Sequence, residues 1–471
     1  MAHDKSKTEK TREFTSILLA AGKGTRMYSA LPKVLHPVAG LPMIHRVIKA
    51  VRGAGATDLR VVVGYGENLV RQVTEPMGAV CYRQDNQLGT ADAVRSADPE
   101  TLEGHVLILN GDHPLIRPEH ILAIYEEYLD LQCDFVVVSA KVKEPGELGR
   151  IVRHKGELKA IVEARDASAD TLAIDEINTA IYFMKADVLK KFLPKIKNQN
   201  SKQEFYFTDM VSLCLEAGLK VKVVEGAQEL AMGVNNQREL AAATKQVFLK
   251  SAYDLMDKGV VIVDPDNTYI EESVTVGAST VIYPGVSLRG KTKVGQFCVL
   301  ENNSILSDAQ LEDSVQVRAH CYIEKSLVKT KATVGPFARL RPDTQIGVEA
   351  HVGNFVEMKK VNFGDRSKAG HLTYLGDADV GKDTNIGCGT ITCNYAADKK
   401  KYRTTIGDQV FVGSDTQFVA PVTIGDHAII GSGSTITKNV PAKALAVARG
   451  KQVVKENYSP KAPSTSTEKK S

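Results

Sequence analysis

The sequence predicts a chain in two parts: an α/β half with a Rossmann-like, mainly parallel sheet, and an all-β half built as a parallel β-helix. In the first half, short apolar runs alternate with segments of helical periodicity. In the second half, aliphatic residues recur every six positions, and glycine often follows them. A chain of 471 residues is long enough for two or more domains, each with a core of its own.

The first buried strand is expected just before a glycine-rich turn. Five small or apolar residues precede this turn, which contains Gly22 and Gly24. Glycine lets backbone N–H groups approach a ligand closely, and Lys23, Arg26 and Lys33 add cations to the same region. The spacing matches neither the dinucleotide-binding motif nor the P-loop. The turn therefore predicts a phosphate site of another kind, with a plain β-turn as the alternative interpretation.

The alternation of strands and helices continues to about residue 224. Strands are expected at residues 59–63, 106–110, 135–140 and 181–184, and helices at residues 43–51, 118–131 and 208–217. Ligands of such sheets bind at the carboxyl ends of the strands. Asp112 follows one of these ends, where a carboxylate suits Mg²⁺, which prefers oxygen ligands and shares substrate phosphates. A turn residue is the other interpretation of Asp112.

A helix over residues 237–258 is expected to join the halves, because apolar residues fall there at helical spacing and Gly259 follows. Beyond it the six-residue repeat begins, as in Ile406, Val412 and Phe418. Three such hexads make one triangular coil. The repeat is interrupted at residues 361–374 and 394–402, and we expect loops on a binding face at both places.

Polar side chains gather around these interruptions. Arg341 and Lys359 suit a sugar phosphate, because both are cations. His371 is expected to be a general base, since imidazole titrates near neutral pH. A structural role for His371 is the alternative, but its polar neighbours, Tyr374 among them, favour catalysis.

The pattern L-A-A-G-x-G-T-R-M, closed by Pro32 and Lys33, resembles the signature of sugar-nucleotide pyrophosphorylases. The first half resembles the uridylyltransferase half of bacterial bifunctional UDP-N-acetylglucosamine synthesis enzymes, and the second half resembles their acetyltransferase half almost letter for letter. The resemblance implies a left-handed β-helix. We expect a uridylyltransferase domain over residues 14–236, a helical linker over 237–258, an acetyltransferase domain over 259–450, and a disordered tail over 451–471.

The resemblance also implies roles for residues of the first half. Those expected to hold uridine are Leu19, Ala20, Gly22, Gln84, Gly89 and Thr90. Those expected to hold the sugar are Gly149, Glu163 and Asn178. Lys33 and Arg26 would neutralise the triphosphate, and Asp112 and Asn235 would ligate Mg²⁺. Asn110 departs from the family, which usually has tyrosine there, and this affects a contact to the sugar.

In the second half the resemblance implies that Arg341 and Lys359 hold the sugar phosphate, and that His371 removes a proton from the amine. The sugar would be oriented by Tyr374 and Asn385. The acetyl-CoA channel would be lined by Asn394, Tyr395, Ser414, Ser432 and Arg449. Cys388 and Ser432 stand where the family usually has alanine, and the larger Cys388 is expected to narrow the thioester pocket.

Two reactions in sequence are thus implied. Glucosamine 1-phosphate is first N-acetylated by acetyl-CoA, and the product then attacks the α-phosphorus of UTP and releases pyrophosphate. UDP-N-acetylglucosamine feeds the synthesis of bacterial peptidoglycan and of outer-membrane lipopolysaccharide, and the family implies a homotrimer. The alternatives are a single pyrophosphorylase with a regulatory β-helix, a scaffold that only trimerises, and a zinc enzyme built on His351 and His371.

Composition narrows the remaining function classes. A formal net charge of +4 is too small to argue for nucleic acid. The seven cysteines are scattered and never form C-x-x-C, which favours reduced thiols in a cytoplasm over disulfides or a zinc ribbon. The N-terminal residues carry no signal-peptide pattern and no apolar run is long enough to span a membrane, so we expect a cytoplasmic protein that binds neither membranes nor nucleic acid.

Overall fold

The computed structural model describes residues 13–458, and the chain divides into two compact units between Ser251 and Ala252. Within the described residues, no helix combines the length and the apolar character that a membrane span requires. Most of the predicted tail, residues 459–471, lies outside the described residues. The functional domain limits expected from the sequence stay predictions.

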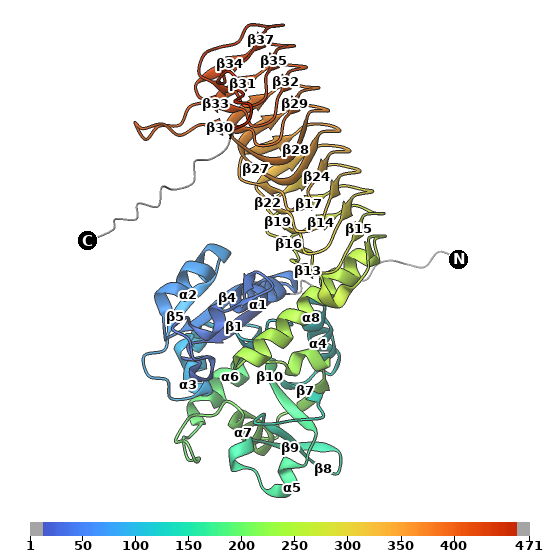
Figure 1. Ribbon diagram of the computed structural model, residues 1–471. Coiled ribbons are helices and arrows are strands. Elements are labelled where there is room, and N and C mark those ends of the chain that lie inside the picture. Colours follow the sequence, from blue (N-terminus) through green and yellow to red (C-terminus); the bar gives the residue numbers. More distant parts are fainter. Residues whose placement is uncertain (1–12, 459–471) are drawn as a thin grey trace, which may run out of the picture. The chain divides into compact units, whose positions relative to one another are not determined.

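The first unit is a nine-stranded sheet covered by helices (Figure 1). Its strands are β1 Phe14–Ala20, β4 Ala56–Val63, β5 Val80–Arg83, β6 His105–Asn110, β7 Phe135–Lys141, β8 Arg150–His154, β9 Glu157–Val162, β10 Glu176–Lys185 and β11 Val221–Glu225. Its helices are α1 Met43–Gly53, α2 Glu67–Thr74, α3 Thr90–Ser96, α4 Pro118–Asp130, α5 Ala169–Leu172, α6 Ala186–Phe192 and α7 Asp209–Glu216, and α8 Gln237–Met256 begins in this unit and ends in the second. A small ribbon pairs β2 Pro37–Val38 with β3 Leu41–Pro42.

The main strand order is β11-β7-β10-β6-β1-β4-β5, and β8 and β9 form a hairpin beside β10. Strand β1 lies near the centre, where it pairs in parallel with both β4 and β6. Neighbouring residues of β1 face opposite cores: Leu18 packs with α1 and α4, and Ile17 packs with α3, α6 and α7. Burial on both faces explains why residues 17–20 of this strand form a continuous apolar run.

The predicted strands and helices of this unit are present, with ends that differ by a few residues. One difference matters for the topology. The strand expected at residues 181–184 is the end of β10, which runs antiparallel to both of its neighbours, β6 and β7. Apolar alternation marks a buried strand but carries no information on its direction, so the sequence did not reveal this reversal.

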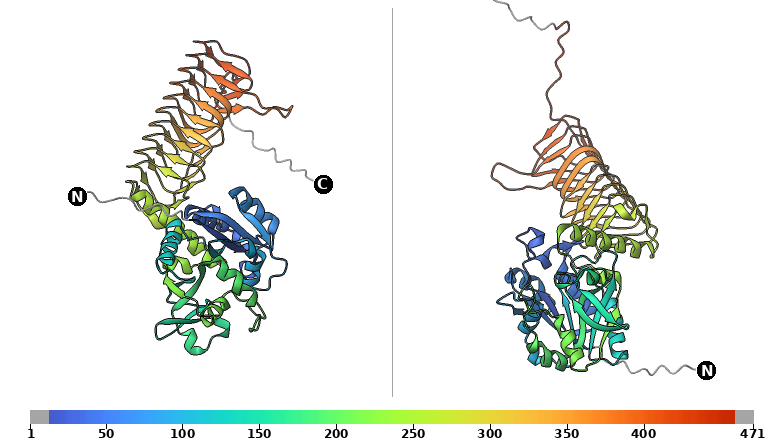
Figure 2. Two further views of the ribbon diagram at one scale, coloured as in Figure 1. Left: turned by 180° about the vertical axis from the view of Figure 1, so that it is seen from behind. Right: turned by 90° about the horizontal axis from the view of Figure 1, so that it is seen from below.

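The second unit is a stack of coils, one parallel β-helix (Figure 2). Its strands are β12 Val261–Ile262, β13 Tyr269–Ile270, β14 Thr275–Val276, β15 Val281–Ile282, β16 Ser287–Arg289, β17 Lys293–Val294, β18 Val299–Leu300, β19 Ile305–Ser307, β20 Gln310–Leu311, β21 Gln316–Val317, β22 Tyr322–Glu324, β23 Ser326–Val328, β24 Thr333–Val334, β25 Arg339–Leu340, β26 Thr344–Ile346, β27 His351–Phe363, β28 Lys368–Val380, β29 Asn385–Ile386, β30 Ile391–Cys393, β31 Thr404–Ile406, β32 Phe411–Val412, β33 Gln417–Val419, β34 Val422–Ile424, β35 Ile429–Ile430, β36 Thr435–Ile436 and β37 Leu445–Ala446.

Over most of the stack each short strand pairs in parallel with the strand three places further on, so three strands make one coil. The hexad residues point inward: Ile406, Val412 and Phe418 are almost completely buried. They belong to one continuous core that runs the length of the unit. The six-residue repeat is therefore the spacing of inward side chains around a triangular coil, as the sequence predicts.

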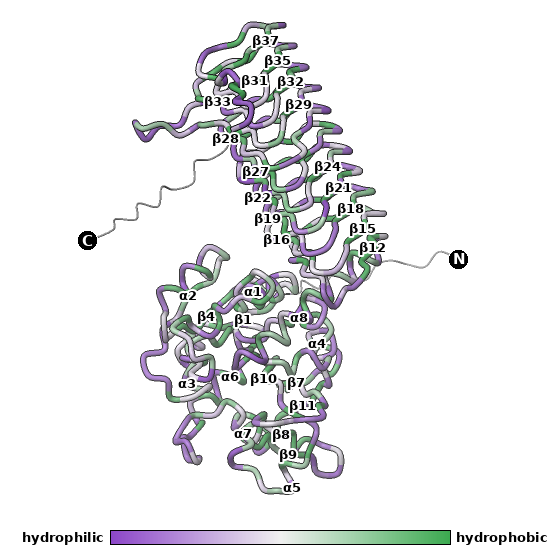
Figure 3. Tube along the Cα trace, viewed as in Figure 1, coloured by the Kyte–Doolittle hydropathy of each residue, from purple (hydrophilic) through white to green (hydrophobic). Residues whose placement is uncertain are grey.

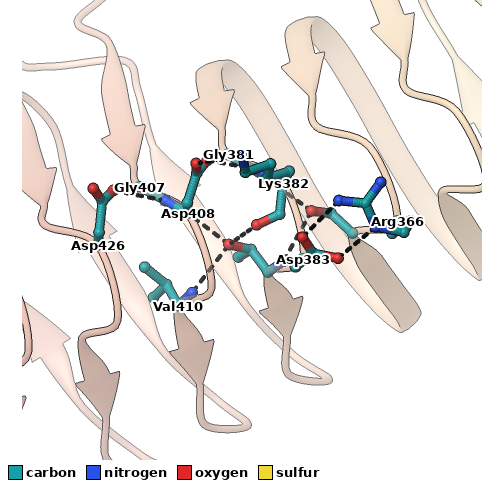
Figure 4. Close-up of polar contacts among 10 residues, drawn as sticks. Arg366, Gly381, Lys382, Asp383, Gly407, Asp408, Val410 and Asp426 are labelled. Atoms are coloured by element: carbon teal, nitrogen blue, oxygen red, sulfur yellow. Dashed lines mark hydrogen bonds and ion pairs between the residues drawn. The ribbon is translucent and has the colours of Figure 1, made fainter.

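One corner of the coils explains why glycine follows so many hexad residues (Figure 4). The carboxylate of Asp408 accepts a hydrogen bond from the backbone N–H of Lys382 in the coil before it, at 2.9 Å. The carboxylate of Asp426 in turn accepts a hydrogen bond from the backbone N–H of Asp408, at 2.8 Å. A Cβ on Gly381 would lie 2.6 Å from the backbone nitrogen of Asp408, so this position has no room for a side chain.

The two interruptions of the repeat have different outcomes. The loop expected at residues 361–374 is absent, and that prediction was wrong. Strands β27 and β28 pair in parallel through this segment, and Val361 and Ala369 are fully buried. Asn354 and His371, which pair in register on β27 and β28, are seventeen residues apart. Three full hexads would separate them by eighteen residues, so the coil is one residue short and the repeat shifts there.

The second interruption is a loop, as predicted. Between β30 and β31 the chain leaves the coil, and Tyr395 forms an isolated antiparallel bridge with Lys401 at the base of the excursion. The register confirms the insertion, because Asn385 pairs with Phe411, twenty-six residues further on. Figure 3 shows this protruding segment in the colour of hydrophilic residues.

Helix α8 matches the predicted connector closely. Val247 is buried among residues of the first unit, and Leu255 is buried in the core of the second. Met256, an apolar residue at the end of the same helix, is 39 % exposed. Gly259 has a φ of +87°, the left-handed conformation expected of glycine after a helix.

Candidate active sites

Two cavities open at the carboxyl ends of β1 and β6 in the first unit. The smaller, about 400 Å³, is lined by the predicted uridine residues Leu19, Ala20, Gly22, Gln84, Gly89 and Thr90. The larger, about 870 Å³, is lined by Arg26, Glu163 and Asn178 among others. Three residues, Asn110, Asp112 and Asn235, line both cavities. The two predicted binding regions therefore meet at the predicted metal ligands.

The ammonium of Lys33 lies between these ligands. It forms an ion pair with Oδ2 of Asp112 and donates a hydrogen bond to Oδ1 of Asn235 at 3.1 Å. Arg26 also donates to Oδ1 of Asn235, at 3.1 Å, and pairs with Glu147 at 2.7 Å. Burial by itself would raise the pKa of Asp112, but the Lys33 ammonium, His113 and hydrogen bonds to the carboxylate together hold that pKa below its usual range. Asp112 is therefore an anion.

The wall of the smaller cavity depends on Gly89, which begins α3. Its φ of +120° favours glycine, and a Cβ there would lie 2.7 Å from the backbone nitrogen of Phe205. The next residue, Thr90, accepts a hydrogen bond from the backbone N–H of Phe207 at 2.9 Å. Gln84 donates its amide N–H to Asp92 at 2.7 Å, which fixes the orientation of that amide.

In the larger cavity Glu163 accepts a hydrogen bond from the hydroxyl of Thr208 at 3.1 Å, and burial raises its pKa. Asn178 donates to the hydroxyl of Tyr182 at 2.7 Å. Gly149 does not line the cavity itself: a Cβ on it would lie 3.6 Å from the carboxylate of Glu163. The carbonyl of Gly149 accepts a hydrogen bond from the backbone N–H of Asn178, so Gly149 supports a residue that lines the cavity.

Sequence reasoning missed His113, which follows Asp112 and lines the larger cavity. Its Nε2 lies 3.6 Å from Oδ1 of Asp112, and both side chains are buried. Burial lowers the pKa of His113, which keeps it neutral. Sequence reasoning also missed Gln87, whose amide donates to the carbonyl of Ala21 at 2.7 Å and so ties down the glycine turn. Neither position carries a motif that could have revealed it.

In the second unit the predicted sugar-phosphate residues lie on adjacent coils around β27 and β28. Arg341 donates to Glu357 at 2.9 Å, and Glu357 pairs in register with Tyr374. Lys359 faces Lys401, which lies in the inserted loop and which sequence reasoning missed. This neighbouring cation is the main cause that lowers the pKa of Lys359. The concentration of positive charge suits an anion such as a phosphate.

His371 is exposed on β28, and its Nδ1 lies 2.6 Å from Oδ1 of Asn354 on β27. An amide oxygen can only accept, so Nδ1 is the donor of this hydrogen bond, and Nε2 takes no part in it. Asn394 lies near Tyr374: a Cβ on Gly376 would meet both the Tyr374 hydroxyl and the Asn394 amide, at 2.5 and 2.7 Å. The structure thus brings Tyr374 and Asn394 together.

Four other predicted residues lie along one corner of successive coils. The carbonyl of Cys388 accepts the N–H of Asp415, and the carbonyl of Ser414 accepts the N–H of Gly433. The carbonyl of Ser432 accepts a hydrogen bond from Arg449 at 2.6 Å. Cys388, Ser414, Ser432 and Arg449 therefore form one line, whereas Tyr395 is 63 % exposed on the inserted loop and Asn385 lies on β29.

Comparison with known proteins identifies both halves. The first matches the MobA-like NTP transferase domain over residues 16–176. The second matches the bacterial transferase hexapeptide repeat over residues 403–438 and the GMPPB C-terminal domain over residues 265–361. The bifunctional protein GlmU of Bdellovibrio bacteriovorus is 62 % identical over 96 % of this chain and 98 % of its own. Those of Pelobacter propionicus and Trichlorobacter lovleyi are 43 % and 44 % identical, each over 94 % of this chain and 97 % of their own.

The chain belongs to the GlmU family. Membership covers both halves, so the chain is a bifunctional uridylyltransferase and acetyltransferase in the synthesis of UDP-N-acetylglucosamine. The predicted fold class and activity are confirmed, and the alternatives of a scaffold and of a single pyrophosphorylase are set aside. Among the residues that the structure describes, no three His, Cys, Asp or Glu side chains converge, so a zinc site at His351 and His371 has no ligand set there.

Proposed function

We propose that uridylyl transfer in this GlmU-family chain occurs where the two cavities of the first unit meet. The observation that carries the proposal is that the cavities share Asn110, Asp112 and Asn235. UTP binds in the smaller cavity, with its phosphates on the turn at Gly22. N-Acetylglucosamine 1-phosphate binds in the larger cavity, with its phosphate directed at the shared residues. The two reacting phosphates then face each other beside Asp112.

Recognition of each substrate follows from the chemistry of its cavity. The edge of uracil alternates N–H and C=O groups, and the fixed amide of Gln84 offers both a donor and an acceptor. Backbone groups of Leu19, Ala20 and Gly89 complete that pocket. On the sugar side, Glu163 and Asn178 offer acceptors and a donor for hydroxyl and acetamido groups, with Asn110 at the entrance in place of the usual tyrosine.

Asp112 and Asn235 are the residues that would hold Mg²⁺. The fit rests on the donor set, one carboxylate and one amide oxygen, and on Oδ1 of Asp112, which is buried and has no hydrogen-bond partner. When bound there, the ion would neutralise negative charge on the phosphates. The nucleophile is already a phosphate anion, so the protein need not supply a base. The part of Arg26 and Lys33 is to position the triphosphate and to neutralise the charge of the leaving pyrophosphate.

We assign acetyl transfer to the polar cluster on β27 and β28. Arg341 and Lys359, with Lys401 beside them, bind the phosphate of glucosamine 1-phosphate. Tyr374 and Asn385 orient the sugar ring. Nε2 of His371 then accepts a proton from the amine, which must be neutral before it can attack a thioester.

The corner formed by Cys388, Ser414, Ser432 and Arg449 is proposed as the acetyl-CoA track, with Asn394 and Tyr395 at its side. Each coil exposes backbone and small side chains there, which suits an extended pantetheine arm. Arg449 at the end of the line is placed to meet a phosphate group of the coenzyme. Cys388 adds a larger side chain than the usual alanine and narrows the start of the track.

We propose a homotrimer, supported by an apolar column next to the acetyltransferase cluster. The rings of Phe337 and Phe355 stack at 5.4 Å, and His320 stacks on Phe337 at 4.9 Å. Phe337, Phe355 and Leu372 are 48, 54 and 59 % exposed. Contiguous exposed apolar residues mark interaction sites, and a cyclic trimer would use this contact three times. We also propose a cytoplasmic location, supported by seven free cysteines.

The proposal is tested by replacing Asp112 with alanine. Asp112→Ala should abolish Mg²⁺-dependent release of pyrophosphate from UTP and N-acetylglucosamine 1-phosphate. Release of free thiol from acetyl-CoA and glucosamine 1-phosphate should stay at the wild-type rate. Asp58→Ala, which removes a carboxylate paired with Arg60 outside both cavities, is the matched control and should retain both activities. Near-normal pyrophosphate release by Asp112→Ala would contradict the assignment.

A further inference from the structure

The position of the Lys33 ammonium affects how a divalent cation can bind to the first unit. It contacts Oδ2 of Asp112 and Oδ1 of Asn235, which are the two groups assigned to the divalent cation. The pair is shielded from water, because the side chains of Lys33 and Asp112 are 17 and 11 % exposed. Arg26 reaches Asn235 as well, but it pairs with Glu147 rather than with Asp112. Among the described residues, only Lys33 contacts both assigned ligands.

An ammonium and Mg²⁺ cannot share this place. Mg²⁺ binds its oxygen ligands at about 2.0–2.1 Å, so an ion held by Asp112 and Asn235 would take the place where the Lys33 ammonium now contacts both side chains. Two cations side by side in a shielded site repel each other strongly. Lys33 must therefore leave Asp112 before the metal can bind there.

A second position is available to the Lys33 ammonium. It lines the smaller cavity together with Gly22, at the turn assigned to the phosphates of UTP. Its stem packs on the turn itself, since a Cβ on Gly24 would lie 3.2 Å from Cγ of Lys33. A lysine ammonium on a flexible four-carbon stem can turn from one anion to another by rotating side-chain bonds.

We propose that Lys33 competes with the divalent cation and couples its binding to that of the nucleotide. Without nucleotide, the ammonium neutralises Asp112 and keeps metal affinity low. When the triphosphate arrives, Lys33 turns to the phosphates, and Asp112 and Asn235 become available to the metal that accompanies them. Because coupling is reciprocal, each ligand then strengthens the binding of the other. This inference rests on the proposed function, which supplies the two metal ligands.

The test measures metal binding rather than turnover. Mn²⁺ serves as the probe, and free Mn²⁺ is measured by electron paramagnetic resonance during titration of the full chain without nucleotide. Lys33→Met keeps the length of the side chain and removes its charge. It should bind Mn²⁺ at least about fivefold more tightly than the wild type, the lower end of ordinary coupling between sites.

Lys23→Met is the matched control. Lys23 lies in the same glycine turn, but its ammonium is 5.6 Å from the centre of the Tyr65 ring and makes no contact with Asp112. Lys23→Met removes one positive charge but leaves the Lys33 ammonium on the Asp112 carboxylate, so it should change Mn²⁺ affinity little. Equal tightening by Lys23→Met and Lys33→Met would overturn the inference, because net charge alone would then explain the effect. Unchanged or weaker binding by Lys33→Met would overturn it too.

Two further variants separate the possible failures. Asp112→Asn should weaken Mn²⁺ binding in the wild-type background and should remove the tighter binding expected of Lys33→Met. If Asp112→Asn leaves Mn²⁺ binding unchanged, the proposed metal site itself is wrong, and the inference falls with it. If Asp112→Asn abolishes binding but Lys33→Met does not tighten it, the metal site stands and only the competition is wrong. Lys33→Gln provides the same comparison if circular dichroism shows that Lys33→Met is misfolded.

Discussion

At the scale of single residues, the proposed role of His371 depends on which of its ring nitrogens is available. Nδ1 donates a hydrogen bond to Oδ1 of Asn354, so Nε2 is the nitrogen proposed to accept the proton. The same holds for the proposed sugar site of the first unit, where Glu163 is half-buried and burial raises its pKa, an effect that the Lys202 ammonium only partly offsets. We expect the first residue to transfer a proton and the second to bind the sugar at a cost in folding free energy.

His371→Ala should lower the rate of acetylation by about 10²- to 10⁴-fold, the usual effect of losing a general base. The KM for glucosamine 1-phosphate should change much less, because Arg341 and Lys359 still hold the phosphate. Steady-state rates of thiol release over a series of glucosamine 1-phosphate concentrations measure both parameters. A variant that keeps most of the wild-type rate would show that another group is the base.

Glu163→Gln should make the folded protein more stable at neutral pH while weakening sugar binding. Burial raises the pKa of Glu163 in the folded state, so folding costs free energy wherever the unfolded chain would ionise this group. The stability difference from wild type should be absent below the pKa of an ordinary glutamate and should grow as pH rises through the raised value. Thermal melts between acid and neutral pH measure it. A variant that is less stable at neutral pH would contradict the cost assigned to this carboxylate.

At the scale of elements, the β-helix was predictable because its repeat is local and long. Inward residues such as Ile406 and Val412 can be counted in the sequence, and so can the inserted loop that interrupts them. The false loop at residues 361–374 arose because a coil shortened by one residue shifts the repeat without leaving the coil. The reversal of β10 and the contact between Lys359 and Lys401 depend on partners distant in the chain, and no local pattern records such partners.

Gly381→Ala should destabilise the β-helix, because its new Cβ would meet backbone atoms of the next coil and displace the Asp408 cap. Small-to-large changes at packed positions cost about 1–3 kcal/mol, which should appear as a lower midpoint in denaturant. Gly370→Ala is the matched control, since nothing lies within 4 Å of the Cβ that it would add. Equal midpoints for the two variants would show that the corner tolerates a side chain.

At the scale of the whole molecule, the proposed trimer contact lies beside one of the two proposed active sites. The apolar column of His320, Phe337, Phe355 and Leu372 borders the acetyltransferase cluster, since Leu372 follows His371 and Phe355 follows Asn354. The uridylyltransferase cavities are lined only by residues of the first unit. Assembly should therefore affect one activity and spare the other.

Phe355→Glu should break the trimer and lower acetylation, while uridylyl transfer from supplied N-acetylglucosamine 1-phosphate continues. A charge placed in an apolar contact is costly because it must be desolvated there. Phe297→Glu is the matched control, because Phe297 is also exposed and also has a positive φ but has no ring stacked on it among the described residues. Light scattering gives the mass of each variant. A wild-type monomer, or a Phe355→Glu trimer, would contradict the proposed interface.

The most direct test of two independent sites in one chain is product analysis with two variants mixed. Glucosamine 1-phosphate, acetyl-CoA, UTP and Mg²⁺ are supplied to Asp112→Ala, to His371→Ala and to their mixture. Asp112→Ala alone should accumulate N-acetylglucosamine 1-phosphate, and His371→Ala alone should leave glucosamine 1-phosphate largely unused. The mixture should form UDP-N-acetylglucosamine, because the intermediate made by one variant is used by the other. A mixture that forms none, or a single variant that forms it at the wild-type rate, would contradict the account.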